Sequence, residues 1–257
     1  MTNTISVSTD APVAQITLDR PKVLNAINGE LAIELRDTFE RLDDDEEVLV
    51  VHIMGRGESF SSGFDLNELK DDMGGMSYEN FERHAGGKRA LQDLSRLVDS
   101  TDMIVVSTVE GNTLGAGLEL AVISDIAVAA ESATLGFPET EIGLSITNGV
   151  TNLLPRAVGL QRAKLLVLTG ERISGQEAAT LGLVAEAVPD DEVENRSEEI
   201  IESLLEKSPS GLVAAKHLLN YGREGEYEDS LERELNAGLR LLQTEEYQHA
   251  LGEFFDS

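Results

Sequence analysis

The chain has 257 residues, 41% of them hydrophobic, and no cysteine, which suits one large core and excludes disulfides and thiolate chemistry. Its 48 acidic and 20 basic residues give a formal charge of −28, which argues against nucleic acid and anionic membrane surfaces as partners. No stretch approaches the roughly 20 apolar residues of a membrane helix, and residues 1–10 lack a basic region followed by an apolar run. We therefore expect a soluble cytoplasmic protein.

The acidic charge has two interpretations. The plainer one is a well-solvated acidic surface. The sharper hypothesis is adaptation to a cytoplasm with molar salt, where the Debye length is only ~3 Å and repulsion among carboxylates is screened.

The N-terminal part of the chain predicts a hairpin, two helices and a buried strand. Alternating apolar residues over 5–18 indicate the hairpin. Asn28 can cap a helix with an apolar face formed by Leu31, Leu35, Phe39 and Leu42. Residues 48–54 are apolar almost throughout, which is typical of a strand covered on both faces. A longer helix is expected over residues 78–99.

The rest of the chain alternates strands, glycine-containing loops and helices, and then becomes wholly helical. The pattern predicts a strand at 126–130, a helix at 148–158 disrupted by Pro155, helices at 161–169 and 174–182, and a strand at 183–188. After Pro189 it predicts helices at 190–207, 210–221, 228–243 and 245–255. This order favours an α/β fold with a catalytic core at 1–189 and a helical subdomain at 190–257. The apolar faces of that subdomain exceed what one subunit can cover, so we expect self-association.

The stretch from Met103 to Leu120 is the strongest candidate for a site. An apolar strand is followed by a turn containing Gly111, Gly115 and Gly117, where the backbone can turn sharply and approach a ligand closely. A helix that begins near Ala116 would leave its first N–H groups unpaired, which suits an oxygen that becomes negative.

Two carboxylates accompany this turn. Glu119 lies in a nearly all-apolar helix, so we expect it to be buried, with a raised pKa. Glu139 follows Pro138 in a loop twenty residues later. An oxyanion cradle with two fixed carboxylates predicts acid/base chemistry beside a carbonyl.

Other common sites lack their motifs. The glycines at 111–117 do not have the Gly-x-Gly-x-x-Gly spacing of a dinucleotide site, and no phosphate loop or Gly-x-Ser-x-Gly elbow occurs. The four histidines are scattered without ligand spacing, so we expect no metal and assign them structural roles.

Five ordered motifs give the chain a family resemblance. They are Arg20-Pro21-Lys22-Val23-Leu24-Asn25-Ala26, Phe60-Ser61-Ser62-Gly63-Phe64-Asp65-Leu66, Gly115-Ala116-Gly117-Leu118-Glu119-Leu120-Ala121, Gly136-Phe137-Pro138-Glu139 and Leu154-Pro155-Arg156-Ala157-Val158-Gly159. The chain resembles the crotonase (enoyl-CoA hydratase/isomerase) superfamily from about Ile5 to Phe255. The resemblance implies a spiral of ββα units, trailing helices that build a trimer or a hexamer, and an acyl-CoA thioester as substrate.

The resemblance also implies roles for individual residues. Phe64 and Ala116 match the two backbone amides of the oxyanion hole, and Glu119 and Glu139 match the two catalytic glutamates of the hydratases. The implied CoA contacts are Lys22, Val23, Leu24, Ala26, Ser62, Phe64, Asp65, Leu66 and Ala116. No cofactor is expected beyond the coenzyme A of the substrate.

The implied activity is hydration of a 2-enoyl-CoA, in which the glutamates clasp one water. The resemblance favours Glu119 for positioning the water and Glu139 for the α-proton. Alternatives remain open: a double-bond isomerase that needs only Glu139, a ring-cleaving, ring-closing or thioester-hydrolysing CoA enzyme, or a non-enzymatic acyl-CoA-binding scaffold.

The chain departs from the family pattern in two places near the expected acyl pocket. Many hydratases have a proline and several glycines where this chain has Ser145-Ile146-Thr147-Asn148-Gly149-Val150-Thr151. Phe64 replaces a residue that is commonly small. Both departures leave the shape of the substrate open.

Overall fold

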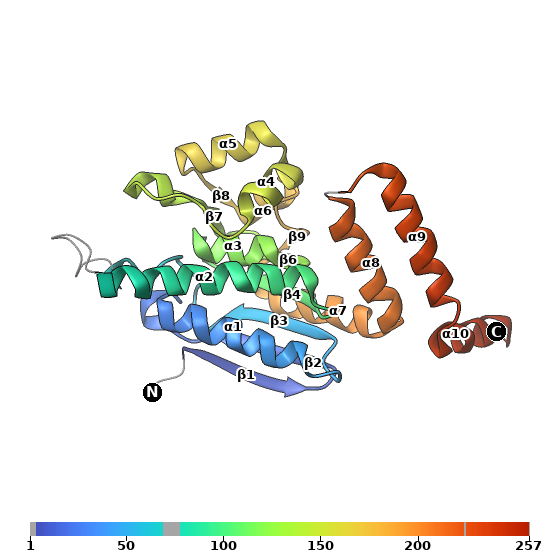
Figure 1. The fold of residues 1–257 in the computed structure, drawn as a ribbon. Helices are drawn as coiled ribbons and strands as arrows, with labels where there is room; N and C mark the ends of the chain where they lie inside the picture. The colour runs from blue at the N-terminus through green and yellow to red at the C-terminus, as the bar shows by residue number, and fades with distance from the viewer. Residues whose placement is uncertain (1–3, 69–77, 224, 257) are drawn as a thin grey trace.

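The computed structural model describes residues 4–68, 78–223 and 225–256 of the chain (Figure 1). Six strands form the main sheet in the order β1-β2-β3-β4-β6-β9. They are β1 (Ile5–Asp10), β2 (Val13–Leu18), β3 (Val50–Gly55), β4 (Ile104–Val109), β6 (Ile126–Ala130) and β9 (Glu186–Val188). The β1–β2 hairpin is antiparallel, and each later pair of neighbours is parallel. The predicted hairpin and buried strands are confirmed.

A second sheet holds three short strands in the order β5-β7-β8. They are β5 (Asn112–Leu114), β7 (Thr134–Gly136) and β8 (Arg172–Ser174). The sequence pattern does not predict these strands, because three residues are too few to show the alternation that identifies a strand. This sheet flanks the glycine turn before Ala116 and the loop before Glu139, so it holds the two candidate segments together.

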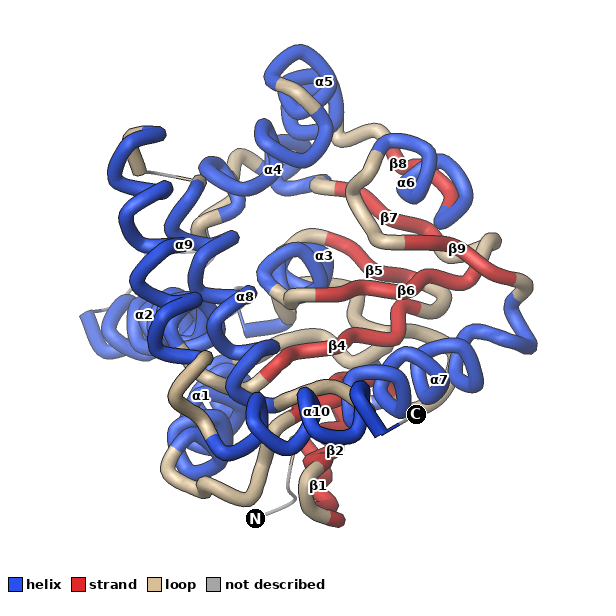
Figure 2. Tube along the Cα trace, turned by 90° about the vertical axis from the view of Figure 1, so that its right-hand side faces the viewer, coloured by secondary structure: helices blue, strands red, loops and turns tan. Residues whose placement is uncertain are grey.

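Helices cover both faces of the main sheet. The long helices α1 (Gly29–Asp43) and α2 (Tyr78–Ser100) pack against each other, and α7 (Val193–Leu205) packs on β4 and β6. Figure 2 shows α1 and α7 on opposite sides of β4. All six residues of β4 are buried, as expected for a parallel strand covered on both faces.

Helix ends follow the local chemistry of the sequence. The Asn28 side chain accepts a hydrogen bond from the Leu31 amide at 2.9 Å and caps α1. Ser174 and Glu177 form the predicted capping box of α6 (Gly175–Leu181). Gly170 ends α5 (Leu160–Thr169) in the left-handed conformation.

The expected disruption at Pro155 is wrong. Helix α4 (Val150–Val158) continues through Pro155 to Gly159. A proline inside a helix removes one backbone hydrogen bond. The buried side chains of Val150 and Leu154 hold this short helix against the core in spite of that loss.

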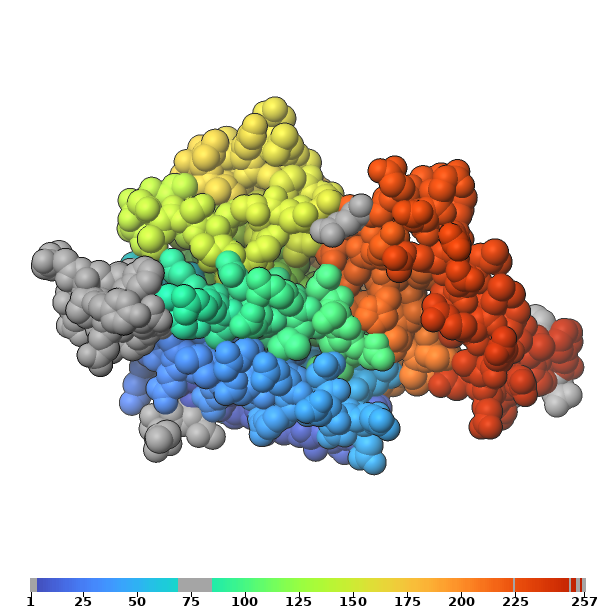
Figure 3. Space-filling view, viewed as in Figure 1, coloured from blue at the N-terminus to red at the C-terminus, as the bar shows by residue number. Residues whose placement is uncertain are grey.

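Three further helices follow α7 at the C-terminal end: α8 (Pro209–Gly222), α9 (Tyr227–Leu241) and α10 (Glu245–Asp256). Figure 3 shows the C-terminal helices projecting from the body of the molecule. Leucines at helical spacing on α9 and just after it are exposed: Leu231 42%, Leu235 62%, Leu239 49% and Leu242 49%. Among the described residues, no helix combines the length and apolar composition needed to cross a membrane.

Candidate active site

The turn before α3 (Ala116–Ile123) brings one of the two glutamates to the start of that helix. Gly115 has φ of +51°, a conformation that side chains rarely adopt. A Cβ at Gly115 would lie 2.9 Å from Glu139 Oε1. Gly115 is therefore required both by its backbone angle and by the carboxyl group of Glu139, which lies against it.

The loop that carries Gly63 and Phe64 lies beside the start of α3, where the Ala116 amide is found. A Cβ at Gly63 would lie 2.7 Å from the Leu114 carbonyl oxygen and 3.5 Å from the Ala116 nitrogen. The Ala116 amide has no partner within α3, because it is the first residue of the helix. The loop before Phe64 therefore packs against the first turn of α3.

The Phe64 amide is turned away from its neighbouring strand segment. Ile27 donates to the Gly63 carbonyl at 2.7 Å and accepts from the Asp65 amide at 2.9 Å. In this parallel bridge, Ile27 bonds to the carbonyl of Gly63 and the amide of Asp65, the residues before and after Phe64. The N–H of Phe64 itself therefore points away from Ile27.

Glu119 is fully buried in the first turn of α3. Its Oε1 accepts hydrogen bonds from the backbone amides of Thr147 at 2.6 Å and Asn148 at 3.4 Å. Its Oε2 accepts one from the side-chain amide of Asn148. Burial raises the pKa of Glu119 to about 7, the Thr147 amide opposes the rise, and the charge of Glu139 adds to it.

Glu139 lies in the 3-10 helix η3 (Pro138–Ile142) and is 7% exposed. Both of its carboxyl oxygens are buried, and neither has a hydrogen-bond partner in the described part of the chain. Burial raises the pKa of Glu139. Burial and mutual repulsion together favour a state in which at least one of the two glutamates carries a proton.

Apart from Ala116 at the start of α3, the residues expected to contact CoA lie on two segments that run side by side. The Ser62 amide donates to the Leu24 carbonyl at 2.9 Å, and the Ser62 hydroxyl donates to the Val23 carbonyl at 3.3 Å. Of the expected contacts, Lys22, Val23, Leu24 and Leu66 are exposed, whereas Ala26 and Asp65 are buried.

Arg20 holds these two segments together, a role that sequence analysis missed. Its guanidinium donates to the Ala26 carbonyl and to Asp65 at 2.9 Å. Burial of Asp65 acts against ionisation, but the bonds from Arg20 and Asn67 outweigh it, so the pKa of Asp65 is lowered. The Lys88 ammonium lies 5.6 Å from the centre of the Phe64 ring, a second contact that the sequence did not reveal.

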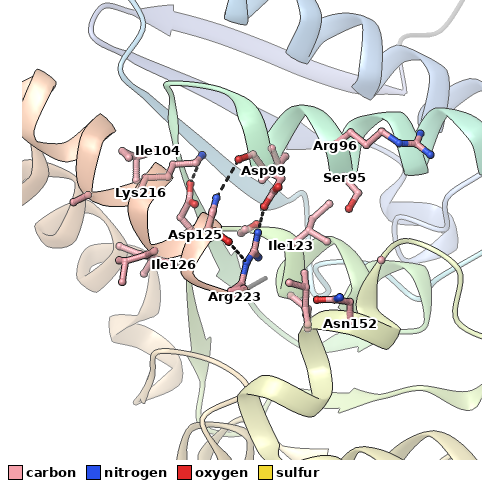
Figure 4. Close-up of a pocket in the computed structure, with 18 of the residues that line it drawn as sticks. Ser95, Arg96, Asp99, Ile104, Ile123, Asp125, Ile126, Asn152, Lys216 and Arg223 are labelled. Carbon is pink, nitrogen blue, oxygen red and sulfur yellow. Dashed lines mark hydrogen bonds and ion pairs between the residues drawn. The ribbon is translucent and has the colours of Figure 1, made fainter. Parts of the chain in front are cut away.

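A cavity of about 580 Å³ lies at the other end of α3, between α2, α4 and α8 (Figure 4). Val122 and Ile123 line it, but Glu119 and Glu139 do not. Charged groups at this cavity are paired: Lys216 with Asp125 at 2.8 Å, and Arg223 with Asp99. In the part of the chain that the structure describes, no three histidines or carboxylates are placed to hold a metal ion.

A protein-family model described as enoyl-CoA hydratase/isomerase matches residues 8–256. The chain belongs to the enoyl-CoA hydratase/isomerase family. It is an enzyme of this family, whose hydratases are hydro-lyases. The expected α/β crotonase-like fold with C-terminal helices is confirmed.

Relatives match nearly the whole chain. A short-chain-enoyl-CoA hydratase of Clostridium acetobutylicum is 31% identical over 255 residues, covering 99% of this chain and 95% of that protein. A 2,3-dehydroadipyl-CoA hydratase of Escherichia coli is 31% identical over 248 residues, covering 96% and 94%.

Solved structures of family members superpose closely on the fold. The enoyl-CoA hydratase of Bacillus anthracis has a TM-score of 0.90 at 31% identity and covers 98% of this chain and 96% of its own. A Thermobifida fusca protein solved in complex with CoA has a TM-score of 0.85 at 29% identity and covers 93% of both chains.

Proposed function

We propose that this enzyme adds water across the 2,3 double bond of a 2-enoyl-CoA thioester. The observation that carries the proposal is the meeting of two buried carboxyl groups, Glu119 and Glu139, at the Gly115 turn where α3 begins. Hydratases of similar sequence over nearly the whole chain support it.

The proposed reaction uses each group for one step. Glu119 orients a water molecule and accepts its proton as the oxygen attacks the β-carbon, while Glu139 supplies a proton to the α-carbon. The amides of Phe64 and Ala116 stabilise the negative charge that develops on the thioester oxygen. Losing one such donor typically costs ~3 kcal/mol of barrier, about a hundredfold or more in rate.

The CoA part of the substrate is proposed to lie along the paired segments around Leu24 and Ser62. The exposed residues Val23 and Leu24 and the Lys22 ammonium offer contacts to the nucleotide and its phosphates. The relative from Thermobifida fusca, solved with CoA, supports a CoA ester as the ligand. We propose no further cofactor.

The test is the absorbance of the conjugated thioester of crotonyl-CoA, followed in multimolar potassium chloride with and without the protein. Hydration removes the conjugation, so the wild-type protein should abolish the signal and Glu119→Gln should slow the loss by orders of magnitude. No loss of signal across a panel of chain lengths would instead favour an acyl-CoA-binding scaffold.

A double-bond isomerase is the second candidate, and the surroundings of the glutamates favour it over the remaining alternatives. Within the described residues, neither oxygen of Glu139 has a hydrogen-bond partner, as a group that shuttles a proton requires, whereas Glu119 accepts hydrogen bonds from three N–H donors. With a 3-enoyl-CoA as substrate, an isomerase would largely survive Glu119→Gln.

We also propose that residues 190–257 form a helical subdomain that assembles the enzyme as a trimer, or as a hexamer of two trimers. The exposed leucine face around Leu235 supports this proposal. Light scattering should give three or six times the mass of one chain, and Leu235→Glu should reduce it.

The formal charge of −28 supports a further proposal, that the enzyme works in a salt-rich cytoplasm. Its melting temperature should rise with potassium chloride as repulsion is screened. Equal or higher stability in dilute buffer would contradict this.

A further inference from the structure

Asn148 contacts the buried carboxyl group of Glu119 with its side chain as well as its backbone. Its side chain is 2% exposed, and its amide group donates to Glu119 Oε2. The Asn148 backbone amide and the Thr147 amide approach the other oxygen, Oε1. The Thr147 hydroxyl lies 3.4 Å from Asn148 Oδ1, which places the oxygen of the side-chain amide on that side and its NH2 toward Glu119.

Helix α2 holds this segment in place from the opposite side. The Gln92 side chain donates to the Thr147 carbonyl at 3.0 Å, and the Ser95 hydroxyl donates to the Asn148 carbonyl at 3.1 Å. Gly149 follows with φ of +83°, and a Cβ there would lie 3.1 Å from Ser95 Oγ. The chain is thus fixed on both sides of the Asn148 side chain.

The three donors leave room for one more ligand on the carboxylate. Each carboxylate oxygen can accept about two hydrogen bonds. Oε1 receives two backbone amides, whereas Oε2 receives only the Asn148 side chain within the described chain. A water molecule bound to Glu119 would therefore be directed to the remaining acceptor position of Oε2, next to the Asn148 amide.

We propose that Asn148 is a positioning residue, whose side-chain amide holds the Glu119 carboxylate in the orientation in which it accepts the proton of the attacking water. This inference rests on the proposed hydration. It concerns a residue outside the two glutamates and the oxyanion amides, and it gives the unusual segment from Ser145 to Thr151 a role in the reaction.

The test compares Asn148→Asp and Asn148→Ala with wild type in the crotonyl-CoA assay over pH 5 to 9. Asp keeps the shape but replaces the donor by an acceptor, and Ala removes the group. Both should lower kcat by roughly tenfold to a hundredfold, the effect of losing a hydrogen bond to a charged group, with KM changed less than about threefold. Asn152→Ala, an exposed position on α4, is the matched control and should stay within about twofold of wild type.

The pH profile separates positioning from general damage to the fold. The hydrogen bond from Asn148 favours the ionised form of Glu119, and Glu139 is the facing titratable group, which opposes that form whenever it is itself ionised. The acid limb of the kcat/KM profile should therefore move upward by about one pH unit in Asn148→Ala and further in Asn148→Asp. A purely structural loss would lower the profile without moving it.

The outcomes are distinct. Wild-type protein without hydration refutes the proposed function itself. If the wild-type protein is active, and the Asn148 variants fold and keep its kcat and its pH profile, only the positioning role is refuted. If both Asn148 variants fail to fold, Ser95→Ala and Gln92→Ala take their place, because they remove the hydrogen bonds to the carbonyl groups of residues 148 and 147. Each should lower kcat and move the acid limb of the kcat/KM profile to higher pH. Unchanged kcat and an unchanged profile in Ser95→Ala and Gln92→Ala would overturn the proposal.

Discussion

Asp125 and Glu119 carry carboxyl groups near opposite ends of α3, and they differ in the charge of their surroundings. Glu119 is fully buried, whereas the side chain of Asp125 is 18% exposed. Asp125 receives the Lys216 ammonium at 2.8 Å and the Val105 amide at 2.8 Å. Among the residues that the structure describes, Glu119 receives only neutral N–H donors, and it faces a second carboxyl group, Glu139. Burial raises both pKa values, but Lys216 opposes the rise at Asp125, whereas Glu139 reinforces it at Glu119.

This difference distinguishes a structural charge from one suited to proton transfer. A buried charge with a partner of opposite sign fastens elements together, here α8 to the end of α3, as Figure 4 shows. A buried carboxyl group without a counter-ion changes its protonation near neutral pH, which is what acid/base catalysis needs.

The largest effect is expected at Glu139. Glu139→Gln keeps the size of the side chain but removes the proton for the α-carbon, so kcat/KM for hydration should fall by up to about 10⁴-fold, roughly 5 kcal/mol of barrier. Glu141→Gln is the control, because Glu141 lies two residues on but pairs with Arg172 at the surface. Steady-state kinetics on both variants measures the effect, and more than a tenth of wild-type activity in Glu139→Gln would rule out its role.

The next effect concerns stability at the other end of α3. The Lys216 side chain is 3% exposed and that of Asp125 is 18% exposed, so Lys216→Met would leave a partly exposed Asp125 without its cation and should lower the free energy of unfolding by roughly 3 kcal/mol. Urea denaturation at pH 8 measures it. The double variant Lys216→Met/Asp125→Leu should recover most of the loss, and Arg96→Met, at an exposed pair with Asp93, should cost under about 1 kcal/mol. A small loss in Lys216→Met would contradict the structural role of the pair.

The sequence predicted the environment of Glu119 better than it predicted the ion pair of Lys216 and Asp125. Glu119 could be expected to be buried because its helix is apolar nearly all round, and it is. The long helices and buried strands were likewise predicted from periodicity, because burial along one face repeats at the period of the element.

The contacts between distant segments could not be predicted from the sequence. Lys216 lies 91 residues from Asp125, and no local pattern links them. Asn148 appeared only as a departure from a glycine-rich pattern, since its meaning depends on where α2 places its backbone. The three-residue strands around Gly115 were not predicted, because they are defined by backbone pairing with distant segments and not by an alternation of apolar and polar residues.

A smaller effect should appear in the pH dependence of stability. The pKa of Glu119 is about 7 in the folded protein against an ordinary value of 4.5, so the folded state binds more protons between these values and loses stability as pH rises through them. Between pH 5 and pH 8 this group should cost about 2.5 kcal/mol, and Glu119→Gln should remove that slope. Urea denaturation of wild type and variant at both pH values tests this, with Glu141→Gln as control. If the free energy of unfolding changes equally with pH in wild type and Glu119→Gln, Glu119 stays ionised throughout this pH range.

The smallest effect belongs to His52, a buried base that has a neutral partner in Thr108 at 2.7 Å. Burial lowers the pKa of His52 to about 4 from 6.5, so the unfolded state binds more protons and stability falls as pH drops through this range. From pH 7.5 to pH 5 the loss should be about 2 kcal/mol, and His52→Gln should abolish it. Thr108→Val is the control: it removes the hydrogen bond but leaves the imidazole buried, so it should lower stability at both pH values and keep the slope. If His52→Gln keeps the wild-type slope, the acid sensitivity of the core has another source, and burial without a counter-ion does not govern this group as it governs Glu119.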